Sequence, residues 1–291
     1  MPNHVIVSTL GWSKAPLEEA FAGIAALGFG QVDLALHEGW AHIDPSDIAE
    51  GGATRVREAA QRVRALVSRH DMKGVSAMNV GLRTRDPAEQ RRRLAAVCDL
   101  AAALGVTVIT LGAAPRGTPL EDEAARLRAL LPEGAARGVQ LTVETHTKQV
   151  TELPADAVRL CQEVPGLGLT LDASHYYAGP NGGADFAAVL PYVRHVHLRD
   201  AGSDWDHIQV AAGTGLVDFD RLVGRLHDLG YGGKFAIEYI DSFPVAAVAG
   251  VAAAAAVGSP GAGPPSDIPS NITRMRDVFL AAERGAGISR V

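Results

Sequence analysis

Short apolar segments alternate with longer amphipathic segments along most of this 291-residue chain. The short segments are rich in aliphatic and β-branched residues, and they have the length of buried strands. In chain order they read HVIVST, GQVDLAL, KGVSAMN, VTVITLG, VQLTVET, GLTLDAS, RHVHLRD and KFAIEYI, at residues 4–9, 30–36, 73–79, 106–112, 139–145, 168–174, 194–200 and 234–240. We therefore expect eight strands separated by helices.

The longer segments carry apolar residues at helical spacing, so that each apolar stripe fits one buried helix face. Two of these stripes are Leu17, Phe21, Ile24 and Leu27, and Phe219, Leu222, Val223, Leu226 and Leu229. Asp218 stands just before the second stripe, where an aspartate can cap the first turn of a helix. Glycines that fit the ends of helices follow at Gly28, Gly105, Gly138 and Gly230.

Eight strand–helix repeats without a break in composition predict a closed (β/α)8 barrel of the TIM type, formed as one domain by residues 1–291. In such barrels the active site forms at the carboxyl ends of the strands. The alternative is an open, doubly wound sheet. Its nucleotide-binding form requires a glycine-rich turn after the first strand, and STLGWSKAP lacks that pattern.

Ligand-type side chains stand at the ends of four consecutive predicted strands, in VETHT, LDASH, HVHLRD and IEYID. Glu144, Asp172, His197 and Glu238 would meet there as three carboxylates and one imidazole. This oxygen-rich set suits one divalent ion, with Mn²⁺ favoured and Mg²⁺, Co²⁺ or Zn²⁺ as alternatives. Strand-end carboxylates also cap helices or pair with arginines, and that structural role is the competing interpretation.

We expect different roles for three other polar residues near these strand ends. His195 shares a strand face with His197 but lies deeper, so we expect a buried, hydrogen-bonded histidine. Asp200 is expected to orient His197 or a loop. His146 follows the fifth strand and is expected to line the pocket.

The three tryptophans, Trp12, Trp40 and Trp205, all follow predicted strands on the active-site side. Indole rings pack well against the C–H faces of sugars, so at least one of them, with Trp12 as a candidate, is expected to bind substrate. Packing within loop clusters or at an oligomer interface is the alternative.

From residue 143 onward the motifs resemble the xylose-isomerase-like barrels, which include tagatose epimerase, hydroxypyruvate isomerase, inosose dehydratase and endonuclease IV. The resemblance rests on DASH, HVHLRD and the two strand-end glutamates. It implies that Glu144, Asp172, His197 and Glu238 bind the catalytic divalent metal. It also implies that the histidine of DASH, His175, contacts the substrate or lies near the metal.

The resemblance further places Gln209, four residues before Gly213-Thr214-Gly215, in the substrate site. Family members with an arginine there hold a sugar hydroxyl with it, so glutamine implies a weaker contact.

The implied activity is a sugar or sugar-phosphate isomerase or epimerase that works by proton transfer through an enediolate, with Glu144 and Glu238 as the catalytic pair. A metal-dependent lyase of the inosose dehydratase type is the main alternative. An endonuclease IV-type enzyme fits less well, because the ends of the third and fourth strands, SAMNVG and LGAAPRG, lack its histidines.

The formal net charge of -6 argues against nucleic acid or an anionic membrane as a partner. We therefore expect a small sugar or polyol ketone as substrate, and a homo-oligomer is left open. Only two cysteines occur, Cys98 and Cys161, and the start MPNHVIVSTLG lacks the pattern of a signal peptide. Both observations favour the cytoplasm.

An Ala/Gly/Pro-rich stretch, residues 241–271, separates the eighth strand from the last helix, which is expected to begin near Ile272. Its apolar part, residues 245–257, is too short for a membrane span. A lid, a subunit contact and a tolerated insertion are the open interpretations.

Overall fold

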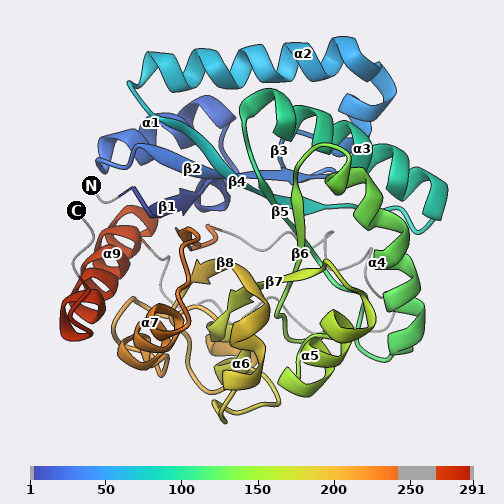
Figure 1. Cartoon of the computed structure of the whole chain (residues 1–291). Helices are drawn as coiled ribbons and strands as arrows, with labels where there is room; N and C mark the ends of the chain where they lie inside the picture. The colour runs from blue at the N-terminus through green and yellow to red at the C-terminus, as the bar shows by residue number, and fades with distance from the viewer. Residues whose placement is uncertain (1–2, 242–266, 289–291) are drawn as a thin grey trace.

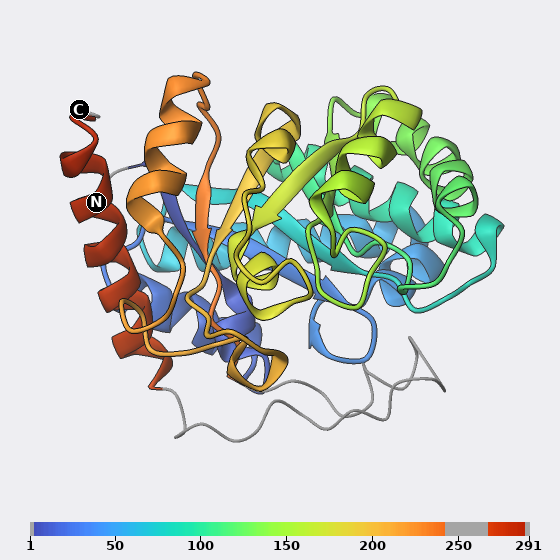
Figure 2. The same cartoon turned by 90° about the horizontal axis from the view of Figure 1, so that it is seen from below.

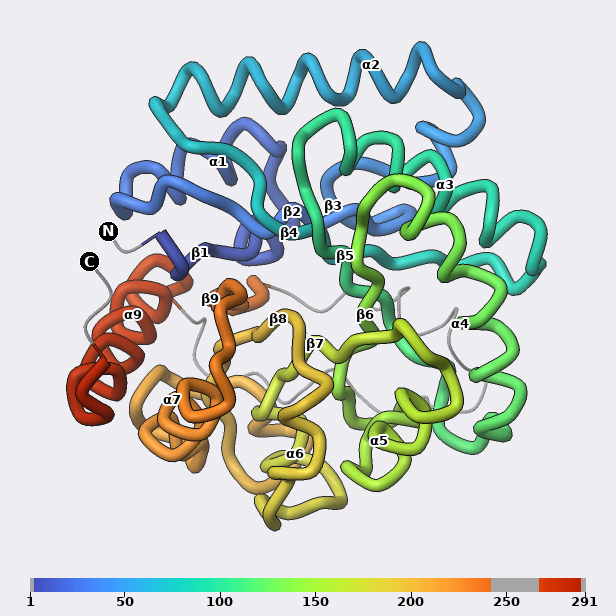
Figure 3. The backbone as a smooth tube through the Cα atoms, viewed as in Figure 1, coloured from blue at the N-terminus to red at the C-terminus, as the bar shows by residue number. Residues whose placement is uncertain are grey.

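Eight parallel strands close into a barrel in the computed structural model of the protein, which describes residues 3–241 and 267–288. The strands are β1 (Val5–Ser8), β2 (Gln31–His37), β4 (Gly74–Gly81), β5 (Val108–Leu111), β6 (Gln140–Glu144), β7 (Gly168–Asp172), β8 (Val193–Leu198) and β9 (Phe235–Ile237). The barrel closes because β1 pairs with both β2 and β9 (Figure 3). A two-residue strand, β3 (Ala41–His42), adds an antiparallel edge to β2.

Helices surround the barrel (Figures 1 and 2). They are α1 (Leu17–Ala26), α2 (Pro45–Arg69), α3 (Pro87–Leu104), α4 (Leu120–Ala135), α5 (Pro154–Glu163), α6 (Ala173–Ala178), α7 (Phe219–Asp228) and α9 (Ile268–Gly285), with short 3-10 helices η1 (Thr9–Trp12), η2 (Ala187–Tyr192) and η3 (Trp205–His207). The (β/α)8 barrel expected from the sequence is therefore confirmed. None of the helices in the described parts of the chain is long and apolar enough to cross a membrane.

The two faces of each strand meet different surroundings, and β8 illustrates the pattern. Val196 and Leu198 are buried in the main hydrophobic cluster that joins the strands to the surrounding helices. His195 and His197, at the alternate positions, contact Asp33 on β2 across the barrel. On β8, the inward face thus carries chemistry-bearing side chains and the apolar face packs against the helices, whereas other strands contribute the buried apolar cluster of Ile6, Ala77 and Ala236.

Most helix signals in the sequence are confirmed. The Asp218 carboxylate accepts a hydrogen bond from the Arg221 backbone N–H at 2.9 Å and so caps α7. The four glycines expected at helix ends all have left-handed backbone, with φ of 82° at Gly28, 73° at Gly105, 68° at Gly138 and 71° at Gly230. Leu229 was expected to belong to the buried face of this helix, and this prediction was wrong. Leu229 is 55% exposed, because it follows the last residue of α7.

The last helix begins earlier than the sequence indicated, at Ile268 instead of near Ile272. Asp267 caps it by accepting a hydrogen bond from the Ser270 backbone N–H, and Ile268 is buried, so these residues belong to the barrel. Residues 242–266, which make up most of the Ala/Gly/Pro-rich stretch, lie outside the described residues.

Candidate metal centre

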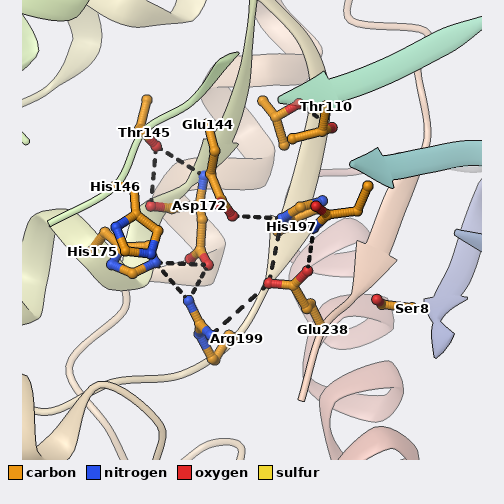
Figure 4. A network of polar contacts seen from close by, with 12 residues as sticks. Ser8, Thr110, Glu144, Thr145, His146, Asp172, His175, His197, Arg199 and Glu238 are labelled. Carbon is orange, nitrogen blue, oxygen red and sulfur yellow. Dashed lines mark hydrogen bonds and ion pairs between the residues drawn. The ribbon is translucent and has the colours of Figure 1, made fainter. Parts of the chain in front are cut away.

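The four strand-end residues come together at the carboxyl end of the barrel, as Figure 4 shows. One ligand-type atom from each of Glu144, Asp172, His197 and Glu238 lies within 4.8 Å of those of the other three. His197 is at the centre, with Nδ1 2.8 Å from Glu144 Oε1 and 3.5 Å from Glu238 Oε2. The strands β6 to β9 are neighbours in the sheet, so their ends deliver these groups to one place.

Neighbouring polar groups hold the carboxylates in position. Asn79, at an interior position of β4, donates a hydrogen bond from Nδ2 to Glu238 Oε1 at 2.9 Å. Asp172 accepts hydrogen bonds at Oδ1 from the backbone N–H and the hydroxyl of Ser174, and so caps α6. Its Oδ2 lies 2.6 Å from Arg199 Nη2. Asp172 thus also has the capping and arginine-pairing roles of the competing structural interpretation.

Burial and the neighbouring charges separate the pKa values of the two glutamates. Burial raises the pKa of Glu238 to about 7, and this increase is only partly offset by His197 and Arg199. Burial would also raise the pKa of Glu144, but the hydrogen bond from His197, together with the charges of His197, His146 and Arg199, outweighs burial and lowers that pKa to about 2. Burial opposes the charge on His197, yet the surrounding carboxylates raise its pKa well above the ordinary value.

The residues fit a divalent cation. Three carboxylates and one imidazole, with ligand atoms within 4.8 Å of one another, have the composition and spacing of a site for Mn²⁺, Mg²⁺ or a similar ion. Without an ion, a proton on His197 Nδ1 and the Arg199 guanidinium balance part of the carboxylate charge. The arrangement is therefore a candidate metal centre.

Two histidines and a tryptophan stand beside this centre on the Asp172 side. The imidazole rings of His146 and His175 lie 3.8 Å apart, centroid to centroid (Figure 4). Trp205 on η3 stacks against His175 at 6.3 Å, and Lys148 Nζ lies 3.8 Å from the centre of the indole ring. Burial lowers the pKa of His175 well below its ordinary value, so this imidazole is neutral at pH 7.

Trp12 and Gln209 are not brought into the four-residue cluster. The indole of Trp12 covers Gly23 on α1, where even a methyl group would collide with it. The amide of Gln209 is engaged with the backbone of Ile240: its Nε2 donates to the carbonyl at 2.9 Å and its Oε1 accepts from the N–H at 2.7 Å. Gln209 thus holds the segment after β9.

Asp200 holds a loop, which is one of the two roles expected for it. Its carboxylate accepts hydrogen bonds from the backbone N–H groups of Gly213 and Gly215 at 2.9 and 2.8 Å, and from Ala201 at 3.0 Å. These contacts hold the β8–α7 connection, which follows the carboxyl end of β8.

Replacement of Gly215 by alanine is expected to destabilise the protein by about 1–3 kcal/mol, because overpacking a close contact costs about that much. A Cβ there would lie 2.5 Å from the Ala201 carbonyl oxygen and 2.6 Å from Asp200 Cγ. Urea unfolding followed by circular dichroism measures the change. Gly224→Ala on α7 is the matched control, since nothing lies within 4 Å of its Cβ position. Equal stability of the two variants would contradict this description of the loop.

Sequence reasoning missed three residues that contact the candidate metal centre: Asp33, Asn79 and Arg199. Alternation along their strands carried a signal, because each shares the parity of an interior position. Arg199 follows His197 by two residues, and its guanidinium is buried against Asp172 and His175. Burial alone would raise the pKa of Asp33, but His195 and His197 lower it to about 2, so this residue is a buried carboxylate.

Comparison with solved structures finds similar folds over nearly the whole chain. A xylose isomerase-like TIM barrel protein from Mycobacterium smegmatis in complex with magnesium is 18% identical, with a TM-score of 0.72 and coverage of 98% of this chain and 99% of that one. An L-ribulose 3-epimerase is 18% identical, with a TM-score of 0.68 and coverage of 97% and 96%. A probable 3-DHS dehydratase from Bacillus anthracis is 13% identical, with a TM-score of 0.66 and coverage of 94% and 98%.

At these identities the structural matches establish the fold alone. A comparison with curated proteins finds no significant match. The family model for the xylose isomerase-like TIM barrel, however, matches residues 21–257, which is well over half of the sequence. The chain therefore belongs to the xylose isomerase-like TIM barrel family.

Proposed function

We propose that this protein is a divalent-metal-dependent isomerase or epimerase of a sugar or sugar phosphate. One observation carries the proposal: two glutamates, Glu144 and Glu238, come from strands three positions apart and face the same cluster of ligand atoms. A carbonyl substrate held over the cluster would lie between two carboxylates. The L-ribulose 3-epimerase, one of several epimerases among the similar folds, supports this proposal.

The chemistry is proton transfer next to a carbonyl. A divalent ion bound by Glu144, Asp172, His197 and Glu238 would polarise the substrate carbonyl as a Lewis acid, with Mn²⁺ the favoured ion. One glutamate removes the neighbouring proton to give an enediolate, and the other returns a proton to complete the isomer or epimer. His175 and His146, stacked beside Asp172, would contact the substrate hydroxyls, and Trp205 would cover that side.

A lyase is the second candidate, because one of the similar folds is a probable dehydratase. It would use the same first proton removal and then expel a β-hydroxyl in place of returning a proton. A cytoplasmic location agrees with two buried, unpaired cysteines, Cys98 and Cys161.

A turnover screen tests the proposal. Purified protein would be loaded with Mn²⁺ and incubated with ketoses, their phosphates, inososes and small hydroxyketones, and the products would be identified by NMR. We expect an epimer or aldose–ketose isomer that forms only when metal is present. Loss of water from the substrate would establish the lyase instead, and no conversion across the panel would contradict both.

A further inference from the structure

A chain of three buried side chains crosses the barrel interior beneath the candidate metal centre. Asp33 on β2 and His195 and His197 on β8 are each at most 1% exposed. His195 Nε2 lies 3.0 Å from Asp33 Oδ2, and His197 Nε2 lies 3.3 Å from the same oxygen. A single carboxylate oxygen therefore faces one imidazole nitrogen from each histidine.

The two nitrogens of His197 face different partners. Nδ1 points to the metal-centre carboxylates, 2.8 Å from Glu144 Oε1, while Nε2 points away from them toward Asp33. Among the described residues, neither His197 Nε2 nor Asp33 Oδ1 has a partner that meets full hydrogen-bond geometry. Buried polar atoms without a partner are costly, and the Asp33 carboxylate, with Oδ2 3.3 Å from His197 Nε2, is the acceptor that this nitrogen faces.

We propose that Asp33 is a positioning residue for the metal centre: it accepts the Nε2 proton of His197 and thereby leaves Nδ1 to bind the ion. The inference rests on the proposed function and deepens it. A histidine that binds a metal through one ring nitrogen usually donates a hydrogen bond from the other. That hydrogen bond selects the tautomer and fixes the orientation of the ring. His195 in turn holds Asp33 by donating from Nε2, so the carboxylate cannot rotate away.

Geometry excludes a direct role for Asp33 at the substrate. Its carboxylate is fully buried below His197, so a substrate entering at the mouth of the barrel would meet the metal centre first. A second ion between Asp33, His195 and His197 is the competing interpretation, since these residues also place ligand-type atoms within 4.8 Å of one another. If a metal titration finds two ions bound per chain, that result would support the second ion site and overturn the proposal.

The test is the Mn²⁺ affinity of Asp33→Asn, measured by isothermal titration calorimetry. We expect one site in the wild-type protein and a dissociation constant about 10- to 100-fold higher in the variant, as for other partners of metal-bound histidines. Glu123→Gln is the matched control. Glu123 is a carboxylate of similar burial, paired with Arg126 on α4, and its loss should leave the metal affinity within about twofold.

A second measurement needs no variant, in case Asp33→Asn fails to fold. Long-range ¹H–¹⁵N spectra of the wild-type protein loaded with Zn²⁺ would report which nitrogen of His197 carries the proton. A proton on Nε2 and a metal-bound Nδ1 support the proposal, and the reverse overturns it. Equal Mn²⁺ affinity of wild type and Asp33→Asn would overturn this inference alone, whereas a wild-type protein that binds no metal would overturn the proposed function with it.

Discussion

Replacement of Glu144 or Glu238 by glutamine is expected to lower kcat by about 10³- to 10⁴-fold in protein saturated with metal. Glutamine keeps the shape of glutamate and an oxygen ligand, but it can neither accept nor return a proton. Loss of a positioned acid or base costs roughly 10²- to 10⁴-fold, because the proton transfer that it performs occurs in the transition state. Steady-state kinetics on the substrate found by the turnover screen would measure the loss.

Metal content must be measured in the same samples, so that lost chemistry is separated from lost metal. Glu133→Gln is a suitable control, because Glu133 lies on α4 and pairs with Arg91 and Arg137 outside the barrel. Its kcat should equal that of the wild type. Near-normal kcat in both Glu144→Gln and Glu238→Gln would mean that these residues do not carry the reaction.

Removal of divalent metal is expected to abolish turnover and to lower the thermal unfolding midpoint. In the metal-free site three carboxylates crowd together, with Arg199 and His197 as the nearby cations. An ion at 100 times its dissociation constant stabilises the folded protein by about 2.7 kcal/mol. For a protein of this size, with an unfolding entropy of about 2.1 cal/mol/K per residue, that corresponds to a shift of roughly 4 °C, which differential scanning calorimetry resolves.

The control for this shift is Asp172→Asn, which removes one ligand charge and should reduce the response of the midpoint to Mn²⁺. Restored activity on adding Mn²⁺ back to chelated protein would separate metal loss from damage. Full turnover after exhaustive chelation, or an unfolding midpoint indifferent to Mn²⁺, Mg²⁺, Co²⁺ and Zn²⁺, would contradict a metal-dependent mechanism.

The barrel could be predicted from the sequence because its signals are local. Eight short apolar runs and the cap at Asp218 depend only on neighbouring residues. The convergence of Glu144, Asp172, His197 and Glu238 could also be predicted from the sequence, because successive parallel strands end at the same edge of the barrel. Period-two alternation correctly indicated that His195 is buried and hydrogen-bonded.

The remaining features depend on contacts between distant segments. The contact of Asp33 with His195 and His197 spans 162 and more residues of sequence and forms only when β2 and β8 face each other in the closed barrel. The register shift between Val32 and Asp33 on β2 also affects its position. The hydrogen bonds between the Gln209 amide and the Ile240 backbone also join residues that are distant in the sequence. No local sequence pattern could have predicted them.

Turnover in D₂O is the measurement that tests the central claim most directly. A proton exchanged through Glu144 and Glu238 comes from solvent, so solvent deuterium should appear on the substrate carbon next to the carbonyl. NMR of the recovered substrate and product should detect this label with Mn²⁺-loaded wild-type protein, and it should be absent after chelation and in Glu238→Gln. Product formed with complete retention of its original hydrogen would contradict proton transfer between these two glutamates and would indicate a hydride shift instead.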